Sequence, residues 1–130
     1  MLRSIFLAAA APPPLKITDW AGKWPRASEA EIEISLKDGK LAISGEAAYG
    51  ARDPARVNSG GVNPGSIDGE AAPKGNVIAL GEGYDGAAAP SSLDQSDCKV
   101  RLRLFGRYLV AEDNLACGGH NVSFTGVYVK

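Results

Sequence analysis

The stretch from Glu31 to Ala47 constrains the fold of this chain more than any other. Polar and apolar residues alternate strictly from Glu31 to Leu36, which is the period of a strand buried on one face. Asp38-Gly39 follows, and this pair favours a two-residue type I′ turn because both of its positions need positive φ. Such a turn places the large apolar groups on one face through three cross-strand pairs: Leu36 with Leu41, Ile34 with Ile43, and Ile32 with Gly45. The sequence therefore predicts a β-hairpin over residues 31–47.

A second hairpin is predicted in the carboxy-terminal third. Its first strand has an apolar face made by Cys98, Val100, Leu102 and Leu104, and a basic face made by Lys99, Arg101 and Arg103. The chain turns at residues 105–106 or 106–107 and returns over residues 107–111; the sequence does not decide between the two frames. Three basic residues on one strand face resemble a surface that binds an anion or a nucleic acid. The solvated outer face of an antiparallel hairpin explains them without any ligand, and we favour that interpretation.

The two cysteines predict a disulfide. Cys98 begins the second hairpin, and pairing of its strands brings residues 113–115 opposite Cys98, so that a bend at Gly118-Gly119 puts Cys117 within reach. A bridge closing about 20 residues stabilises a domain by roughly 3 kcal/mol on the chain-entropy model. A zinc site built from Cys98, Cys117 and His120 would lack the paired spacing typical of such sites. A Cys–His nucleophile pair would need special geometry, because these residues are close in sequence.

The remaining segments extend the β pattern. Residues 75–81 and 121–130 read as further strands, with Phe124 and Tyr128 on one face of the last, and Trp20 and Trp24 are core candidates. No segment gives a convincing helix pattern. We therefore predict an all-β, antiparallel fold of about 7–8 strands with one disulfide. A small barrel, closed or nearly so, is the first interpretation, and a two-sheet β-sandwich is the alternative.

Two segments are predicted to be loops. Residues 48–73 contain Asp-Pro, Gly-Gly and Asn-Pro-Gly turn signals, with at most a short strand near residues 66–70, and loops of this length are often functional. Arg52, Asp53 and Arg56 form a charged cluster there, which could offer a guanidinium to a carboxylate. Arg–Asp pairs that tie the loop to itself are the favoured interpretation of this cluster. Residues 82–96 lack a phosphate-loop pattern and are interpreted as a connection only.

Length, charge and the first residues indicate an exported single domain. The chain has 130 residues and a net charge of −1 without a long basic run, which argues against a nucleic-acid partner. Residues 1–14 combine Arg3, a short apolar run, four alanines and three prolines, so they are interpreted as a signal-like or flexible segment before a single β domain at residues 15–130. No run reaches the roughly 20 apolar residues that span a bilayer. We expect a periplasmic or extracellular monomer.

Two resemblances add to this. Gly22-Lys23-Trp24 resembles the opening of lipocalin and avidin-type barrels, which implies a small-ligand barrel. The patterns of a second resemblance are Arg52-Asp-Pro-x-Arg-Val, Gly61-Val-Asn, Cys98-x-Val-Arg-Leu-x-Leu and Asp113-Asn-x-x-Cys-Gly-Gly-x-Asn-Val-x-Phe-x-Gly-x-Tyr128. They resemble a group of small exported bacterial domains of unassigned activity, some of which accompany lysozyme-inhibitor-like segments. This second resemblance covers about residues 15–130. Its link to an inhibitor role comes only through those accompanying segments, whose helical, cysteine-rich pattern is absent from this sequence.

Three functions follow as hypotheses. The first is a non-enzymatic exported domain that binds a protein or another component of the cell envelope, with lysozyme inhibition as one specific form. The alternatives are a small-ligand-binding β-barrel and a hydrolase-like enzyme that uses His120 with Asp113 or Glu112. No catalytic residue, cofactor or metal ligand is assigned. The candidate ligand- or partner-binding residues are Arg52, Asp53, Arg56, Asn114, His120 and Asn121.

Overall fold

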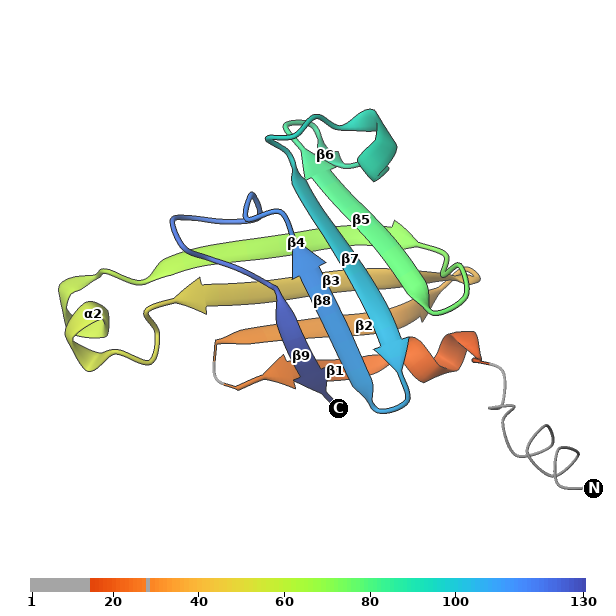
Figure 1. The fold of residues 1–130 in the computed structure, drawn as a ribbon, viewed down its shortest axis with the longest axis horizontal. Helices are drawn as coiled ribbons and strands as arrows, with labels where there is room; N and C mark the ends of the chain where they lie inside the picture. The colour runs from red at the N-terminus through yellow and green to blue at the C-terminus, as the bar shows by residue number, and fades with distance from the viewer. Residues whose placement is uncertain (1–14, 28) are drawn as a thin grey trace, which may run out of the picture.

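Two antiparallel β-sheets make up the part of the chain that the computed structural model describes, residues 15–27 and 29–130 (Figure 1). The four-stranded first sheet has the order β1-β2-β3-β4, and the five-stranded second sheet has the order β6-β5-β7-β8-β9. The first sheet consists of β1 (Gly22–Arg26), β2 (Ala30–Lys37), β3 (Lys40–Tyr49) and β4 (Asn63–Ala71). The second consists of β5 (Val77–Gly83), β6 (Gly86–Ala87), β7 (Cys98–Phe105), β8 (Tyr108–Asp113) and β9 (Gly126–Val129). The signal-like segment predicted at residues 1–14 lies outside the described residues.

The first predicted hairpin is confirmed in type and register. β2 and β3 pair with Leu36 opposite Leu41, Ile34 opposite Ile43, and Ile32 opposite Gly45. Asp38 and Gly39 both have positive φ, 51° and 79°, as a type I′ turn requires. Ile32, Ile34 and Ile43 are buried, so the alternation of the sequence corresponds to the two faces of the sheet.

The long loop predicted at residues 48–73 is wrong in its extent, because the short strand expected near residues 66–70 is part of a longer strand, β4. β4 pairs with β3 over its whole length, from Asn63 opposite Tyr49 to Ala71 opposite Leu41. Pro64 is tolerated because β4 is at the edge of its sheet. Gly65 is needed because a Cβ there would lie 2.6 Å from the carbonyl oxygen of Cys117. These residues read as turn formers in isolation, whereas their strand conformation comes from their neighbours.

The expectation that the chain has no helix is also wrong, although its helices are short. Helix α2 (Pro54–Ser59) lies between β3 and β4. Asp53 is its N-cap and accepts a hydrogen bond from the Ala55 backbone, Pro54 occupies the first turn, and Gly60 ends the helix at φ 74°. Two 3₁₀ helices, η1 (Ile17–Trp20) and η2 (Pro90–Ser92), complete the elements of residues 15–27 and 29–130. No helix of the described residues has both the length and the apolar character to cross a membrane.

The second hairpin is confirmed, and its turn frame is settled. β7 pairs with β8 from Val100 opposite Asp113 to Phe105 opposite Tyr108, so Gly106 and Arg107 form the turn. The last strand is shorter than predicted, since β9 begins only at Gly126. Hydrogen bonds that residues 123–125 donate to the Asp113 carboxylate hold these residues in another conformation.

The sheets pack face to face, and the strands of the second run across those of the first (Figure 1). Large rings fill the space between them: Trp20, Trp24, Phe124 and Tyr128 are all at most 1% exposed. The polar atoms of these rings are satisfied, because Trp24 Nε1 donates to the Trp20 carbonyl at 2.9 Å and the Tyr128 hydroxyl donates to the Phe124 carbonyl at 2.7 Å. Burial raises the pKa of Tyr128 to about 12.

Barrel closure is not found, so the arrangement fits a two-sheet sandwich as well as an open barrel. β1 lies beside β9, and β4 lies beside β5, but neither pair forms a ladder of backbone hydrogen bonds. At the first seam, side chains take the place of such a ladder. The Arg26 guanidinium donates to the carbonyls of Ser123 and Thr125, at 3.1 and 2.6 Å, and Lys130 Nζ donates to those of Asp19 and Ala21, at 3.3 and 2.8 Å.

Candidate functional site

The outward face of the first sheet is rich in carboxylates. In strands that alternate, residues opposite one another in register share a face. Glu31 of β2 lies opposite Glu46 of β3. In the next row of the same face, Glu33 of β2 lies opposite Ser44 of β3, and Ser44 lies opposite Asp68 of β4. All four acidic residues are exposed. The acidic face is therefore built by three strands that follow one another in the chain, β2, β3 and β4.

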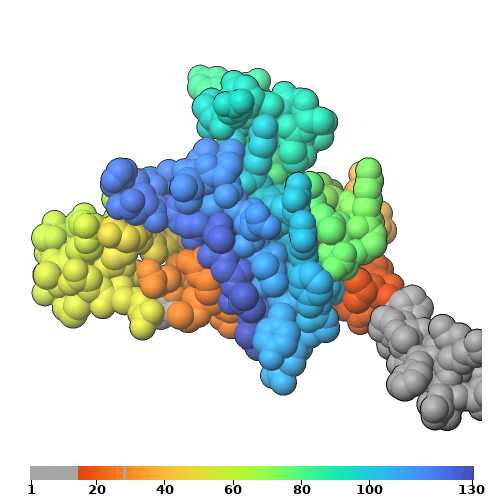
Figure 2. Space-filling model, viewed as in Figure 1, coloured from red at the N-terminus to blue at the C-terminus, as the bar shows by residue number. Residues whose placement is uncertain are grey.

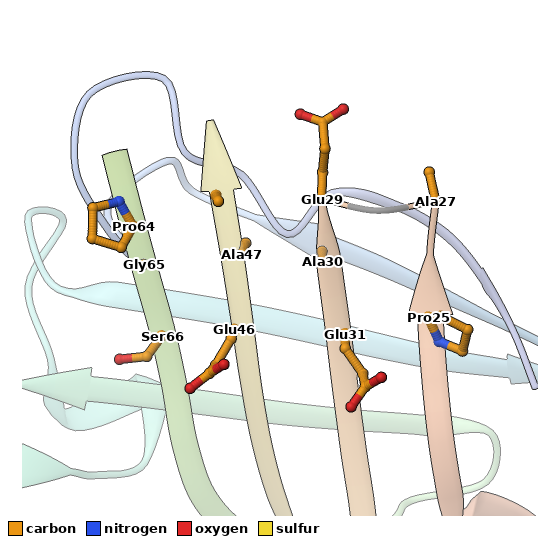
Figure 3. Close-up of a pocket in the computed structure, with 11 residues that line it drawn as sticks. Pro25, Ala27, Glu29, Ala30, Glu31, Glu46, Ala47, Pro64, Gly65 and Ser66 are labelled. Atoms are coloured by element: carbon orange, nitrogen blue, oxygen red, sulfur yellow. The ribbon is translucent and has the colours of Figure 1, made fainter. Parts of the chain in front are cut away.

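An open groove of about 740 Å³ runs across one end of this face (Figure 3). Small and cyclic residues leave it hollow, and three glutamates stand around them; the lining is Pro25, Ala27, Glu29, Ala30, Glu31, Glu46, Ala47, Ala48, Pro64, Gly65 and Ser66. A smaller groove of about 370 Å³ shares Glu31, Glu46 and Ser66 with it and continues toward Glu33 and Asp68. We call the two together the acidic groove.

Most carboxylates of the acidic groove lack a cationic partner. Among the described residues there are two ion pairs, Lys37 with Glu70 at 3.1 Å and Arg52 with Glu29 at 3.6 Å. Glu31, Glu33, Glu46 and Asp68 take part in neither. Like charges directly opposite one another in an antiparallel pair destabilise it, on a scale of about 0.2–1 kcal/mol. The pair formed by Glu31 and Glu46 is therefore a local cost to the fold.

The predicted cluster in residues 52–56 is divided among separate structural roles. Arg52 reaches the rim of the acidic groove through its ion pair with Glu29, and Asp53 caps helix α2. Arg56 lies over the ring of Tyr49, 4.8 Å from its centroid, and donates to the Gly61 carbonyl at 2.9 Å. The expected pairs between these arginines and Asp53 do not form, because the Asp53 carboxylate accepts from the helix backbone instead.

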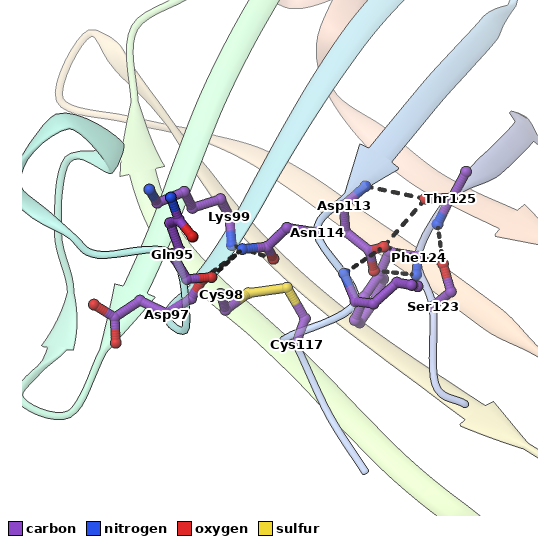
Figure 4. The surroundings of a disulfide bond; sticks show 11 residues. Gln95, Asp97, Cys98, Lys99, Asp113, Asn114, Cys117, Ser123, Phe124 and Thr125 are labelled. Atoms are coloured by element: carbon purple, nitrogen blue, oxygen red, sulfur yellow. Dashed lines mark hydrogen bonds between the residues drawn. A yellow bond between two sulfur atoms is a disulfide. The ribbon is translucent and has the colours of Figure 1, made fainter. Parts of the chain in front are cut away.

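The predicted disulfide is confirmed. Cys98 and Cys117 are bonded, with their Cα atoms 4.6 Å apart (Figure 4). Asn114 stands beside the bridge and fastens the chain around it. Its side-chain oxygen accepts from the Lys99 backbone at 3.0 Å, and its amide donates to the Asp97 carbonyl at 2.7 Å. Asn114 is thus placed in a structural clamp rather than in a groove.

His120 and Asn121 lie at an exposed corner that touches the first sheet. Asn121 has φ 65°, and the backbone carbonyl of His120 accepts a hydrogen bond from the Asn63 side chain at 2.9 Å. A further link joins the corner to β4, where Gly118 forms a bridge with Gly65. The structure therefore brings this corner close to the end of the acidic groove at Gly65, but it does not place either side chain in the groove lining.

Asp113 has a role that sequence reasoning missed. Its carboxylate accepts from the backbone of Leu115 and Phe124, at 3.3 and 2.7 Å, and from the hydroxyls of Ser123 and Thr125, both at 3.1 Å (Figure 4). It thereby ties β8 to the segment before β9. No hydrogen bond between described residues joins Asp113 or Glu112 to His120, so the pairing that a hydrolase-like site would need is not formed in this structure.

The acidic groove was also missed, although part of its signal was present. The register predicted for the first hairpin already implies that Glu31 lies opposite Glu46. The contribution of β4 was not foreseen, because residues 63–71 read as a loop with at most a short strand, and the sequence did not pair that strand with β3. Within the described residues, no three His, Cys, Asp or Glu side chains gather in a way that could hold a metal ion.

Comparisons of the chain with protein-family models, with curated proteins and with solved structures find no match. The resemblances described for Gly22-Lys23-Trp24 and for the Asp113–Tyr128 pattern thus stay predictions.

Proposed function

We propose that this chain is a non-enzymatic binding domain of the cell envelope that holds a basic macromolecule in its acidic groove. The observation that carries the proposal is the directly opposed pair of Glu31 and Glu46, which lies in an open groove without a cationic partner among the described residues. A lysine or arginine of a partner placed between the two carboxylates would turn a repulsion into two attractions.

The rest of the groove fits the same kind of partner. Pro25, Ala48 and Pro64 offer an apolar floor, along which the aliphatic stem of a lysine or arginine can lie. Glu29 and Arg52 at the rim add a charge pair that a partner can rearrange at little cost, because exposed ion pairs are weak. Inhibition of a lysozyme is the specific form that the sequence resemblance implies, and it rests on this binding mode.

The other two hypotheses have less support. A small-ligand barrel needs a cavity between the sheets, where Trp24, Phe124 and Tyr128 are packed with at most 1% exposure. A hydrolase-like site needs a group that orients His120, and the Asp113 carboxylate is engaged elsewhere.

Binding of defined basic probes tests the proposal. The full chain is titrated with a decalysine peptide and with a basic lysozyme in low-salt buffer, by isothermal calorimetry, and the lysozyme is also assayed for cell-wall lysis. We expect binding that weakens with added salt, and a loss of about tenfold or more in affinity when Glu31→Gln and Glu46→Gln are combined. Glu112→Gln is the matched control, since it removes the same kind of charge from the other sheet.

Each result decides something. Affinity for decalysine that is equal in the wild type and the double variant would contradict the proposal. Binding of lysozyme without any effect on lysis would remove the inhibitor form and keep the binding domain.

A further inference from the structure

The outward face of the second sheet differs from the acidic face. Its apolar residues gather at one end, where Phe105 lies opposite Tyr108, Tyr108 opposite Val129, and Val110 opposite Val127. These side chains are open to solvent: Phe105 is 50% exposed, Tyr108 46%, Val127 53% and Val129 37%. Contiguous apolar side chains on a surface mark an interaction site more often than isolated ones do.

Basic residues accompany this apolar patch. Outward positions of β7, β8 and β9, together with the β7–β8 turn, carry four basic residues, Lys99, Arg101, Arg103 and Arg107, against one acidic residue, Glu112. Arg103 lies in the row between Val77 and Val110, and its buried Nε has no hydrogen-bond partner. The face is therefore apolar and cationic at once, which selects an anionic partner with apolar parts.

The shape of this end is convex. The β7–β8 turn projects at the lower edge of the molecule, beyond the neighbouring elements (Figures 1 and 2). Gly106 at its tip has φ 59°, and apart from its two chain neighbours no residue has a heavy atom within 4 Å of the position that a Cβ would take. Phe105 and Tyr108 flank the tip on the same face. A protruding turn between two aromatic residues can enter a soft, flat surface, whereas a folded acidic protein would need a complementary hollow.

We propose that this face docks the domain on an anionic lipid surface. Phe105 and Tyr108 enter the boundary between head groups and acyl chains, as aromatic side chains do at membrane interfaces. Arg101, Arg103 and Arg107 contact lipid phosphates, for which guanidinium groups have a fitting geometry. The acidic groove is on the outward face of the other sheet, so a basic partner and the membrane can be held together. This inference does not depend on the proposed binding function.

Vesicle sedimentation with the full chain tests it. We expect the wild type to bind vesicles of phosphatidylcholine and phosphatidylglycerol, to bind vesicles of phosphatidylcholine alone at least tenfold more weakly, and to be released by salt. Combining Arg101→Gln with Arg107→Gln should weaken binding about thirtyfold, because each basic residue near an anionic surface contributes about 1 kcal/mol. Lys23→Gln with Lys40→Gln removes two exposed positive charges from the first sheet and should leave vesicle binding unchanged.

A second measurement follows the tip itself. In a Phe105→Trp variant, the added indole should shift its emission to the blue on mixing with the anionic vesicles, since Trp20 and Trp24 are already buried. Any of three results would overturn the inference: no binding to anionic vesicles, equal losses in the arginine and lysine variants, or stronger binding of poly-glutamate than of the vesicles. Unchanged vesicle binding of the Glu31→Gln, Glu46→Gln variant would separate this surface from the acidic groove.

Discussion

Replacing Glu46 by Gln should stabilise the domain, although it removes a charge from the proposed binding groove. Glu46 lies directly opposite Glu31, and neither carboxylate forms an ion pair with a described residue. For two exposed carboxylates roughly 6 Å apart, Coulomb's law in water gives a repulsion of about 0.7 kcal/mol. Measured cross-strand like-charge effects cover about 0.2–1 kcal/mol. We therefore expect the free energy of unfolding to rise by about 0.5 kcal/mol, which corresponds to about 2 °C in Tm for a domain of this size.

A double-mutant cycle isolates the repulsion. Urea unfolding is measured for the wild type, Glu31→Gln, Glu46→Gln and the double variant at low salt. Each single change removes the same repulsion, so the double variant should gain less than the sum of the two, with a coupling of about 0.5 kcal/mol. In 1 M salt, where the screening length falls to about 3 Å, the coupling should largely disappear. Glu33→Gln is the control, because Glu33 lies between Ser44 and Lys23 rather than opposite a carboxylate, so this change should not raise the free energy of unfolding.

The outcome bears on function as well as on stability. A coupling near zero at low salt, or a destabilised Glu46→Gln protein, would refute the argument that the two carboxylates repel. If the variant is more stable and also binds decalysine more weakly, the repulsion between Glu31 and Glu46 lowers the stability of the fold but serves partner binding.

Three further predictions concern the carboxy-terminal third. Replacing Cys98 and Cys117 together by Ala should lower the free energy of unfolding by roughly 3 kcal/mol, and an unchanged urea midpoint would contradict this. Asp113→Asn should lower the free energy of unfolding by about 2–4 kcal/mol, because a charged acceptor of several hydrogen bonds is lost. Hydrogen–deuterium exchange of the Phe124 amide should then be faster, and protection equal to that of the wild type would contradict this. The pKa of Tyr128 is raised from 10.0 to about 12, so its neutral form stabilises the fold below pH 10, and this contribution is lost as pH rises through 12. An absorbance titration at high pH should show one tyrosine that ionises later than the others, and this late step should be absent in Tyr128→Phe.

Local rules were sufficient for much of the fold. The hairpin over residues 31–47, its register and its turn depend on side-chain alternation and on the conformational preference of Asp38-Gly39, and all of these concern residues close in sequence. The disulfide was predictable for the same reason, since one hairpin carries Cys98 toward Cys117.

Segments governed by distant neighbours were not predictable in this way. β4 contains Pro64, Gly65 and Gly69, which favour turns in isolation. Gly65 is held in a strand because β3 pairs with it on one side and the Gly118 corner packs against it on the other. The choice between a closed barrel and two separate sheets was equally beyond local reasoning, because it depends on contacts between residues far apart in sequence, such as those of Arg26 and Lys130 with carbonyls at the seam.

The same distinction between local sequence and tertiary structure applies to the candidate site. The sequence by itself determined that Glu31 and Glu46 face each other, because turn chemistry and a period of two set the register of neighbouring strands. Only the tertiary structure decided that β4 extends this face with Asp68, that small residues hollow it, and that Arg52 pairs with Glu29 instead of with the opposed carboxylates. The physical reason is that a strand's alternation comes from its own backbone, whereas the neutralisation of a charge depends on whichever residues the whole fold brings within a few ångströms of it.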